Sequence, residues 1–303
     1  MPILVLVPGG LLRSSIRVAV AAVALPLALA ACSSSDDSSS SSTSSTAGAS
    51  TTTSSASSAQ LDTAAAAYKT YVTGQTAQLV PAVTAFAAAV KAGDVDAAKA
   101  QYPTSRTFYE SIEPVAETFP DDLDPRIDLR EADLEPGAKW TGFHRLEKDL
   151  WAQGLQPDSG AIADQLVADV TELDQRVKAP DFTFDPAKTA GGAAELLEEV
   201  AQSKITGEED IFSHTDLWDF RANVDGSRAA VATVRPILDE RNAELGKQID
   251  KQFGNVDREL DQYRSGDGWV SYDTVTEPQR QALSQRLDAL LAQVSQVQGV
   301  VGG

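Results

Sequence analysis

Cysteine and histidine are almost absent from this sequence. Cysteine occurs once among the 303 residues, at Cys32, and histidine occurs only at His144 and His214. One cysteine excludes a disulfide within the chain and a metal site built from several thiolates. Any bound metal must therefore be held by carboxylate oxygen and imidazole nitrogen.

Basic residues are also scarce. Lysine and arginine together number 25 against 44 aspartates and glutamates, which gives a formal net charge of -19. A chain with this balance is not drawn to nucleic acid or anionic lipid by charge, so we expect no nucleic-acid partner. Its acidic groups attract cations instead.

The sequence lacks the common hydrolase and nucleotide-binding motifs. It contains no His-Glu-x-x-His pair or its inverted form, no Gly-x-Ser-x-Gly elbow and no glycine-rich phosphate loop. Each histidine is alone in its segment, whereas a zinc protease places two on one helix. We therefore expect a protein that is not an enzyme.

The apolar run at the N-terminus is too short to span a membrane. It covers residues 18–29, follows Arg13 and Arg17, and leads into the sequence "LAAC", which ends at Cys32. Basic, apolar and small-residue zones in this order are typical of a secretion signal. "LAAC" resembles the cleavage site of bacterial lipoproteins, so we expect residues 1–31 to be a signal peptide and Cys32 to be lipidated. The mature protein would be extracytoplasmic and anchored to the cell membrane, at the cell surface or in the periplasm.

Residues 32–60 are rich in serine and threonine and offer almost nothing to bury. Burial cannot offset the entropy cost of ordering such a segment, so we expect a disordered tether. The folded domain is then expected at 61–303.

The folded part has the periodicity of helices nearly throughout. Apolar residues recur at intervals of three and four, with Gly93 predicted to end one helix and Asp94 to cap the next. The pattern predicts an all-α fold of two four-helix-bundle-like halves. Its expected helices are 61–92, 95–119, 139–153, 160–177, 186–205, 215–244, 247–264 and 277–297.

Two long acidic connections interrupt this pattern, at 120–140 and 203–220. Connections of such length are uncommon in a bundle unless they carry a function. One ends just before His144 and the other contains His214, so acidic segments and histidines occur together.

His144 and Glu147 are the first candidate metal ligands. They lie three residues apart in "WTGFHRLEKDLW", which places both on one face of a helix. Imidazole with carboxylate suits iron, zinc or manganese. The alternative is a histidine that only packs in the core or on the surface. Gly142, just before it, allows a backbone or ligand to approach closely.

Two further groups could add ligands. Glu113 and Glu117 lie four residues apart in "YESIEPVAETF", where like charges repel unless a cation binds between them. Alternatively, Pro114 begins a new helix and the acidic face is solvated. Asp210 precedes His214 by four residues, and this histidine could instead be a capping or packing residue.

Three segments resemble the signature blocks of a known family. They are "YESIEPVAETFPDDLDPRIDLRE", "WTGFHRLEKDLW" and "ITGEEDIFSHTDLWDFRANVDGS". They look like those of the EfeO/EfeM-type periplasmic iron-uptake proteins of the imelysin-like family, and the resemblance covers 61–297. It implies two four-helix bundles with a metal site around a His-x-x-Glu motif, matched here by His144 and Glu147. Glu113 and Glu117 fall in the acidic block near that motif.

The resemblance also implies partners and cargo. An Efe-type iron importer contains a membrane permease and a haem peroxidase-like protein. Longer family members carry an N-terminal cupredoxin-like domain where this sequence has its serine-rich tether, so the chain resembles the short form. We therefore expect a lipid-anchored protein that binds ferrous or ferric iron, with zinc as a possible ligand, and delivers iron to the permease. The alternative hypothesis is a cell-surface module that binds a protein or peptide and contains a structural histidine.

Overall fold

The computed structural model describes residues 56–303. The expected signal peptide, the expected lipidation site Cys32 and nearly all of the expected tether lie outside the described residues. Helix α1 begins at Ser58, where the side chain of Ser57 accepts a hydrogen bond from the backbone N–H of Gln60.

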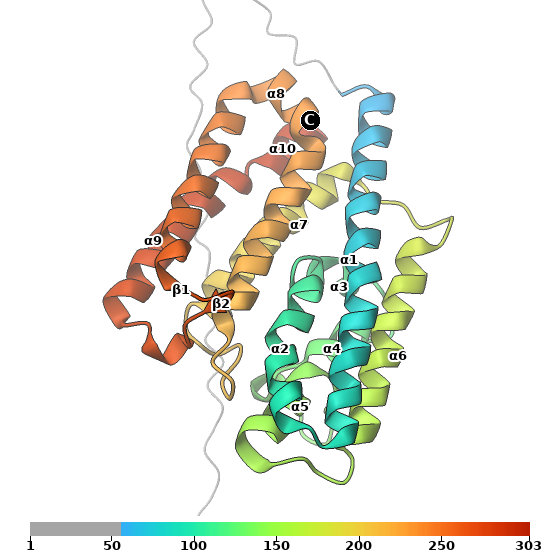
Figure 1. Ribbon diagram of the computed structural model, residues 1–303. Helices are drawn as coiled ribbons and strands as arrows, with labels where there is room; N and C mark the ends of the chain where they lie inside the picture. The colour runs from blue at the N-terminus through green and yellow to red at the C-terminus, as the bar shows by residue number, and fades with distance from the viewer. Residues whose placement is uncertain (1–55) are drawn as a thin grey trace, which may run out of the picture. The chain divides into compact units, whose positions relative to one another are not determined.

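The described chain is helical almost throughout, which confirms the prediction of an all-α fold (Figure 1). The α-helices are α1 (Ser58–Ala92), α2 (Val95–Glu110), α3 (Glu113–Glu117), α4 (Leu123–Asp128), α5 (Phe143–Lys148), α6 (Ser159–Lys178), α7 (Pro186–Glu199), α8 (Asp216–Leu260), α9 (Glu277–Val294) and α10 (Val297–Gly302). Short 3-10 turns lie at Glu131–Asp133, Asp261–Tyr263 and Tyr272–Thr274, and π-helical turns extend α5 over Asp149–Gln153 and α7 over Val200–Lys204. The strands are β1 (Arg264–Ser265) and β2 (Gly268–Trp269), which pair antiparallel.

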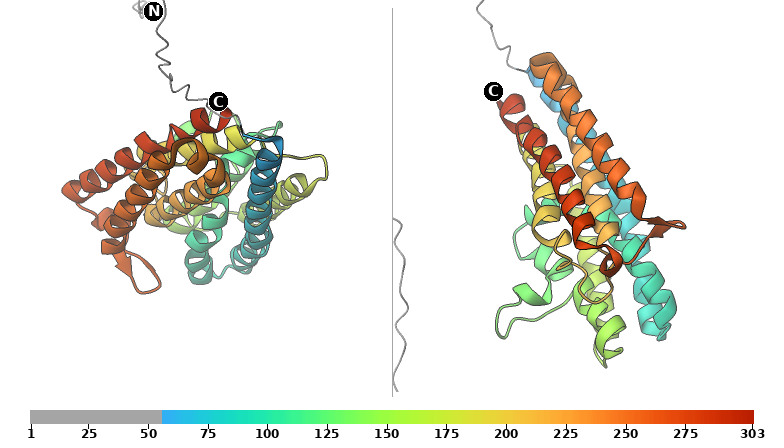
Figure 2. Two further views of the ribbon diagram at one scale, coloured as in Figure 1. Left: turned by 90° about the horizontal axis from the view of Figure 1, so that it is seen from above. Right: turned by 90° about the vertical axis from the view of Figure 1, so that its left-hand side faces the viewer.

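The helices form the two bundle-like halves that the sequence predicts. In one half α1 packs along α2 and α6, and the N-terminal part of α8 contacts α1 and α2. In the other half α7, α8 and α9 pack together, and α10 covers α7 and α8 (Figure 2). Helix α8 bends at Asn242, which has non-helical backbone angles. The two segments of α8 on either side of this bend correspond to the separate helices predicted at 215–244 and 247–264.

The prediction of one continuous helix over 95–119 is wrong for its second half. The chain breaks after α2 and starts again at α3, where Pro114 lies in the first turn, as in the alternative considered for this proline. Gly226 of α8 packs against the break so closely that a Cβ atom would lie 2.2 Å from the carbonyl oxygen of Ser111. The carbonyl of Glu110 accepts a hydrogen bond of 2.8 Å from the side chain of Asn223. The tertiary contact with α8 therefore fixes where α2 ends.

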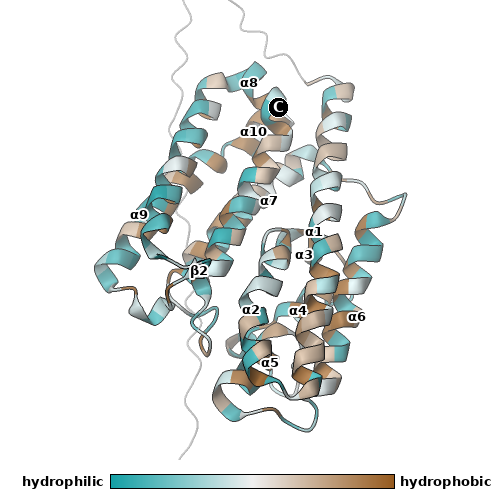
Figure 3. Cartoon of the chain, in the orientation of Figure 1, coloured by the Kyte–Doolittle hydropathy of each residue, from teal (hydrophilic) through white to brown (hydrophobic). Residues whose placement is uncertain are grey.

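The apolar faces of the helices point toward one another, and the outer faces of α8 and α9 are mainly hydrophilic (Figure 3). Inside this apolar core lies an unusual concentration of buried charge. Among residues 56–303, none of the helices combines the length and the low polarity that crossing a membrane requires.

Candidate metal centre

His144 lies in the first turn of α5 because of a close backbone contact just before it. Gly142 has a φ of +88°, and a Cβ atom there would lie 2.1 Å from the carbonyl oxygen of Ile127. Only glycine allows this approach at this backbone conformation. The contact brings the start of α5 against the end of α4, so that His144 lies beside Asp128.

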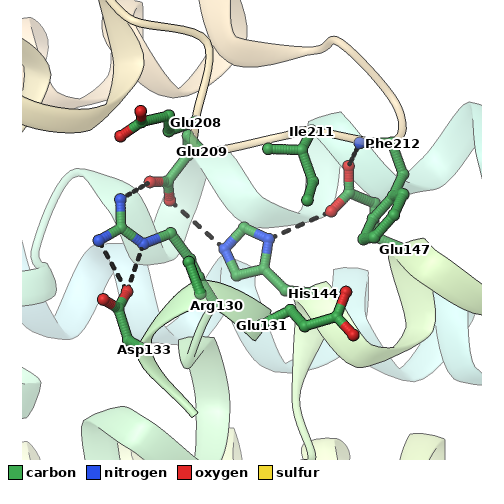
Figure 4. Close-up of a pocket in the computed structure, with 10 residues that line it drawn as sticks. Arg130, Glu131, Asp133, His144, Glu147, Glu208, Glu209, Ile211 and Phe212 are labelled. Carbon is green, nitrogen blue, oxygen red and sulfur yellow. Dashed lines mark hydrogen bonds and ion pairs between the residues drawn. The ribbon is translucent and has the colours of Figure 1, made fainter.

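The imidazole of His144 is buried between carboxylates on both of its nitrogens (Figure 4). Nε2 is 3.4 Å from Oε1 of Glu209 and 3.5 Å from Oδ1 of Asp128. Nδ1 is 3.3 Å from Oε2 of Glu147 and 3.8 Å from Oδ1 of Asp210. Each side forms a group whose ligand atoms all lie within 4.8 Å of one another, which is close enough for one ion.

The oxygens on the Nδ1 side are already used by hydrogen bonds. Oε1 of Glu147 accepts three, from the N–H groups of Phe212 and Ser213 and from the hydroxyl of Ser213. Asp210 accepts from the hydroxyls of Tyr102, at 2.9 Å, and Thr215. Oε1 of Glu147 is thus filled, whereas Oε2 of Glu147 and the two oxygens of Asp210 have one such contact each, so this side has less free capacity than the Nε2 side.

The Nε2 side is different, because it contains buried atoms without hydrogen-bond partners in the described part of the chain. Nε2 of His144 and Oε2 of Glu209 are two of them. Asp128 and Glu209 are both held by the guanidinium of Arg106, which is itself fully buried. Nε2 therefore faces two carboxylates that a fixed cation keeps in position.

Buried acids outnumber buried bases around this histidine. The buried cations are Arg106 and Lys204, both with no exposed side-chain surface, and the partly exposed Arg130 adds a third cation 3.6 Å from Oε2 of Glu209. The nearby buried carboxylates are Glu110, Glu113, Asp128, Glu147, Glu209, Asp210, Asp216 and Asp219. A dry site with such an excess of negative charge must take up cations, either protons or metal ions.

The pKa values follow from this crowding. Burial alone would lower the pKa of His144, but its contacts with Asp128, Glu147 and Glu209 raise it to about 10. Burial raises the pKa of Glu110 to about 8 despite the nearby Lys204 and Arg106. Burial opposes ionisation of Glu209 too, yet Lys204, His144 and Arg106 bring its pKa well below the usual range. In the metal-free protein, protons on His144 and on part of the carboxylates offset the negative charge.

The site opens to a cavity of about 250 Å³. His144, Glu147 and Glu209 line it from inside, and Ile211 and Phe212 line it from the loop before α8. A second cavity of about 160 Å³ adjoins the Nε2 side and shares Glu209 with the first. Its lining also includes Glu113, Glu117, Asp124, Asp128, Asp133 and Glu199.

The structure brings together some of the residues predicted as ligands and separates others. His144, Glu147 and Asp210 form one of the two groups. Glu113 is buried, has no hydrogen-bond partner for Oε2 among the described residues, and lines the second cavity. Glu117 lines the same cavity but is exposed. His214 belongs to neither group; it is half-buried with a φ of +57°, and its carbonyl accepts from the N–H of Tyr272.

Four members of the cluster around His144 were not predicted from the sequence: Asp128, Glu209, Arg106 and Tyr102. Asp128 and Glu209 lie in the two acidic connections that were predicted to have a function, but each connection contains several acids and none has a distinguishing motif. Arg106 and Tyr102 lie in α2, where a buried arginine cannot be told from an exposed one.

Comparisons with known proteins identify the family of this chain. A family model described as imelysin, under the label Peptidase_M75, matches residues 64–297. The protein is 49% identical over 245 residues to a protein named "Iron uptake system component EfeO" of Escherichia coli O157:H7. It is 48% identical over the same length to those of E. coli K12 and Shigella flexneri. These alignments cover 80% of this chain and 64% of each relative, so the chain spans less than two thirds of their length. The chain belongs to the imelysin family.

Proposed function

We propose that this protein is a lipid-anchored, extracytoplasmic component of an iron uptake system, which binds one iron ion at His144 and delivers it to a membrane permease. The observation that carries the proposal is a single buried histidine among eight buried carboxylates, with two buried cations, Arg106 and Lys204, and the partly exposed Arg130 beside them. A metal ion replaces the protons that this charge otherwise requires.

We assign the ion to the Nε2 side of His144. Nε2 of His144 and Oε2 of Glu209 have no hydrogen-bond partner there, although Arg130 lies 3.6 Å from that oxygen, whereas Oε1 of Glu147 on the Nδ1 side accepts three hydrogen bonds. Asp128 and Glu209 are the proposed carboxylate ligands, and Glu113 is the next carboxylate in the adjoining cavity. In this proposal Asp128 and Glu209, one from each acidic connection, take the place of Glu147 and Asp210 as direct ligands.

The donor set fits iron. One imidazole nitrogen with several carboxylate oxygens suits ferrous or ferric iron, and zinc and manganese as well. The printed names of the relatives, which describe iron uptake, favour iron over the other two. Arg106 and Lys204 hold the carboxylates in place without being displaced, so the ion meets a largely preformed site.

Export, anchoring and partners are part of the same proposal. The "LAAC" sequence at Cys32 supports a lipid anchor, and the serine-rich segment after it supports a tether of variable reach. The relatives' names as system components support further Efe proteins as partners, namely an iron permease and a haem peroxidase-like protein. No peptidase activity is proposed despite the family label, because the only histidine of the cluster has no second histidine beside it.

Calorimetric titration tests the binding step. The full chain, produced with Cys32→Ser to prevent lipidation and stripped of metal, is titrated with ferrous, ferric and zinc ions. We expect tight one-to-one iron binding that His144→Ala and Glu209→Gln each weaken at least 100-fold. His214→Ala is the matched control and should bind as tightly as the parent protein. Weak binding at many sites in the parent would overturn the proposal and favour a protein- or peptide-binding module.

A further inference from the structure

We propose that Glu147 is a positioning residue: one of its carboxylate oxygens orients His144 and the other holds the loop that covers the cavity. Loss of the loop contact and release of the ion are then coupled through one side chain. The inference rests on the proposed function, since the ion released is the metal bound at His144.

One carboxylate oxygen of Glu147 contacts the loop. Oε1 of Glu147 lies 3.0 Å from the N–H nitrogen of Phe212, 2.7 Å from that of Ser213 and 2.8 Å from the hydroxyl of Ser213. A carboxylate oxygen has about two lone pairs, so three donors leave it no room to bind a metal. This oxygen therefore serves the loop.

The other carboxylate oxygen of Glu147 contacts the imidazole. Oε2 of Glu147 lies 3.3 Å from Nδ1 of His144 and is oriented to accept its proton. A proton fixed on Nδ1 leaves the lone pair of Nε2 for the metal, which is the usual arrangement of a carboxylate behind a metal-bound histidine. Glu147 thus sets both the ring orientation and the tautomer.

The loop has the position of a cover. Ile211 and Phe212 line the cavity next to His144, and Figure 4 shows Phe212 beside Glu147. Ile211 is 41% exposed and is the one large apolar side chain exposed in residues 56–303. When the bonds to Oε1 break, the loop can move from the cavity and Glu147 is no longer fixed against the imidazole.

Two variants separate the two contacts. Ser213→Ala removes the hydroxyl bond to Glu147 together with the contact to the hydroxyl of Thr215, and leaves every proposed ligand intact. Glu147→Gln retains an oxygen for the loop but can present an amide N–H to Nδ1, which favours the wrong tautomer for metal binding. Thr206→Ala is the control for the lost hydroxyl, since its hydroxyl bonds only to the carbonyl of Ser203 among the contacts described. Glu135→Gln, at an exposed position, is the control for the lost charge.

Amide hydrogen exchange in the metal-free full chain tests the contact between Glu147 and the loop separately from metal binding. We expect the amides of Phe212 and Ser213 to be protected in the parent protein, in Glu147→Gln and in both controls, and to exchange several-fold faster in Ser213→Ala. If the amides at positions 212 and 213 exchange at the same rate in Ser213→Ala and Thr206→Ala, the proposed role of Glu147 in holding the loop is wrong, whatever the outcome for metal binding.

Zinc-loaded protein tests the coupling, with a chelator to measure release and X-ray absorption to report the ligands. We expect Ser213→Ala to release zinc about 3- to 10-fold faster with an unchanged spectrum, and Glu147→Gln to bind zinc about 10- to 100-fold more weakly. If Ser213→Ala releases zinc at the same rate as the parent protein, the positioning role is wrong. It is also wrong if the X-ray absorption spectrum of Glu147→Gln shows one oxygen ligand fewer than that of the parent. A parent protein that binds neither zinc nor iron would instead refute the proposed function, with the exchange result still standing.

Discussion

Glu209 places a carboxylate oxygen 3.4 Å from Nε2 of His144, although the two residues lie on opposite sides of α6 and α7 in the sequence. The contact joins the loop before α8 to helix α5. Glu147 faces the other nitrogen of the same ring, so the imidazole has carboxylates on both sides. A histidine in this position can exchange a proton for a metal ion without leaving its pocket.

Gly142→Ala should disturb the metal site from outside it. A Cβ atom at this position would lie 2.1 Å from the carbonyl of Ile127, so α5 must move away from α4 and His144 from Asp128. Gly137→Ala is the matched control, since Gly137 also has a positive φ, of +86°, but no atom within 4 Å of a Cβ. Both variants carry a backbone cost of about 1–3 kcal/mol, and that of Gly142 lies at the upper end because its ψ of -166° falls in a region that essentially only glycine adopts. We expect Gly142→Ala to lose stability beyond that amount in chemical unfolding and to bind iron more weakly; equal losses would contradict the packing role.

Arg106→Met should be strongly destabilising. Removal of this guanidinium leaves Glu110, Asp128 and Glu209 buried without their main partner. Breaking a buried ion pair by removing one member costs about 3–5 kcal/mol. Arg235→Met removes a partly exposed arginine paired with Asp250 and should cost no more than about 1 kcal/mol. Similar losses of unfolding free energy for the two variants would show that the buried cluster does not depend on Arg106.

The metal-free protein should lose stability as the pH rises from 5 to 8.5. Burial raises the pKa of Asp124 to about 7 and that of Asp216 to about 8, whereas unfolded aspartates titrate near 4. The folded state therefore holds protons in this range that the unfolded state has released. The resulting stability is complete below about pH 4 and is lost as the pH passes through 7 to 8.

Thermal melting at both pH values checks this prediction. Asp124→Asn should melt higher than the parent at pH 8.5 and nearly equally at pH 5, because its amide does not ionise. Asp181→Asn, at an exposed position, should leave the profile unchanged. A parent protein that is more stable at pH 8.5 than at pH 5 would contradict the account of the buried acids.

Metal binding should release a proton at neutral pH. Its carboxylate neighbours raise the pKa of His144 to about 10 against the cost of burial, so Nε2 carries a proton until an ion displaces it. The affinity should therefore rise with pH up to about 10. Calorimetry in buffers of different ionisation enthalpy measures the proton count directly, and a heat that is the same in all buffers would exclude displacement at His144.

The sequence allowed the fold to be predicted better than the site. Periodicity at three and four residues marks the long helices, and the spacing of His144 and Glu147 places both on α5. The contact of Asp128 and Glu209 with His144 depends on how α4 and the loop before α8 pack, and this packing has no local signal. The break after Glu110 likewise depends on Gly226 and Asn223 of α8.

The sequence also could not predict which nitrogen of His144, Nε2 or Nδ1, faces the proposed metal site. Glu147 has the spacing of a ligand, but the donors that occupy its oxygen, Phe212 and Ser213, come from a distant loop. His214 shows the opposite case: its rarity and acidic neighbours suggested a ligand, and the structure places it in a turn outside both groups.

The most direct test of the central claim is a crystal structure of the iron-loaded protein with an anomalous difference map at the iron edge. The account predicts one strong peak about 2.0–2.2 Å from Nε2 of His144, with oxygens of Asp128 and Glu209 as further ligands and Glu147 bound to Nδ1. A peak on the Nδ1 side, a peak among surface acids alone, or no peak in protein that has bound iron in solution would contradict it.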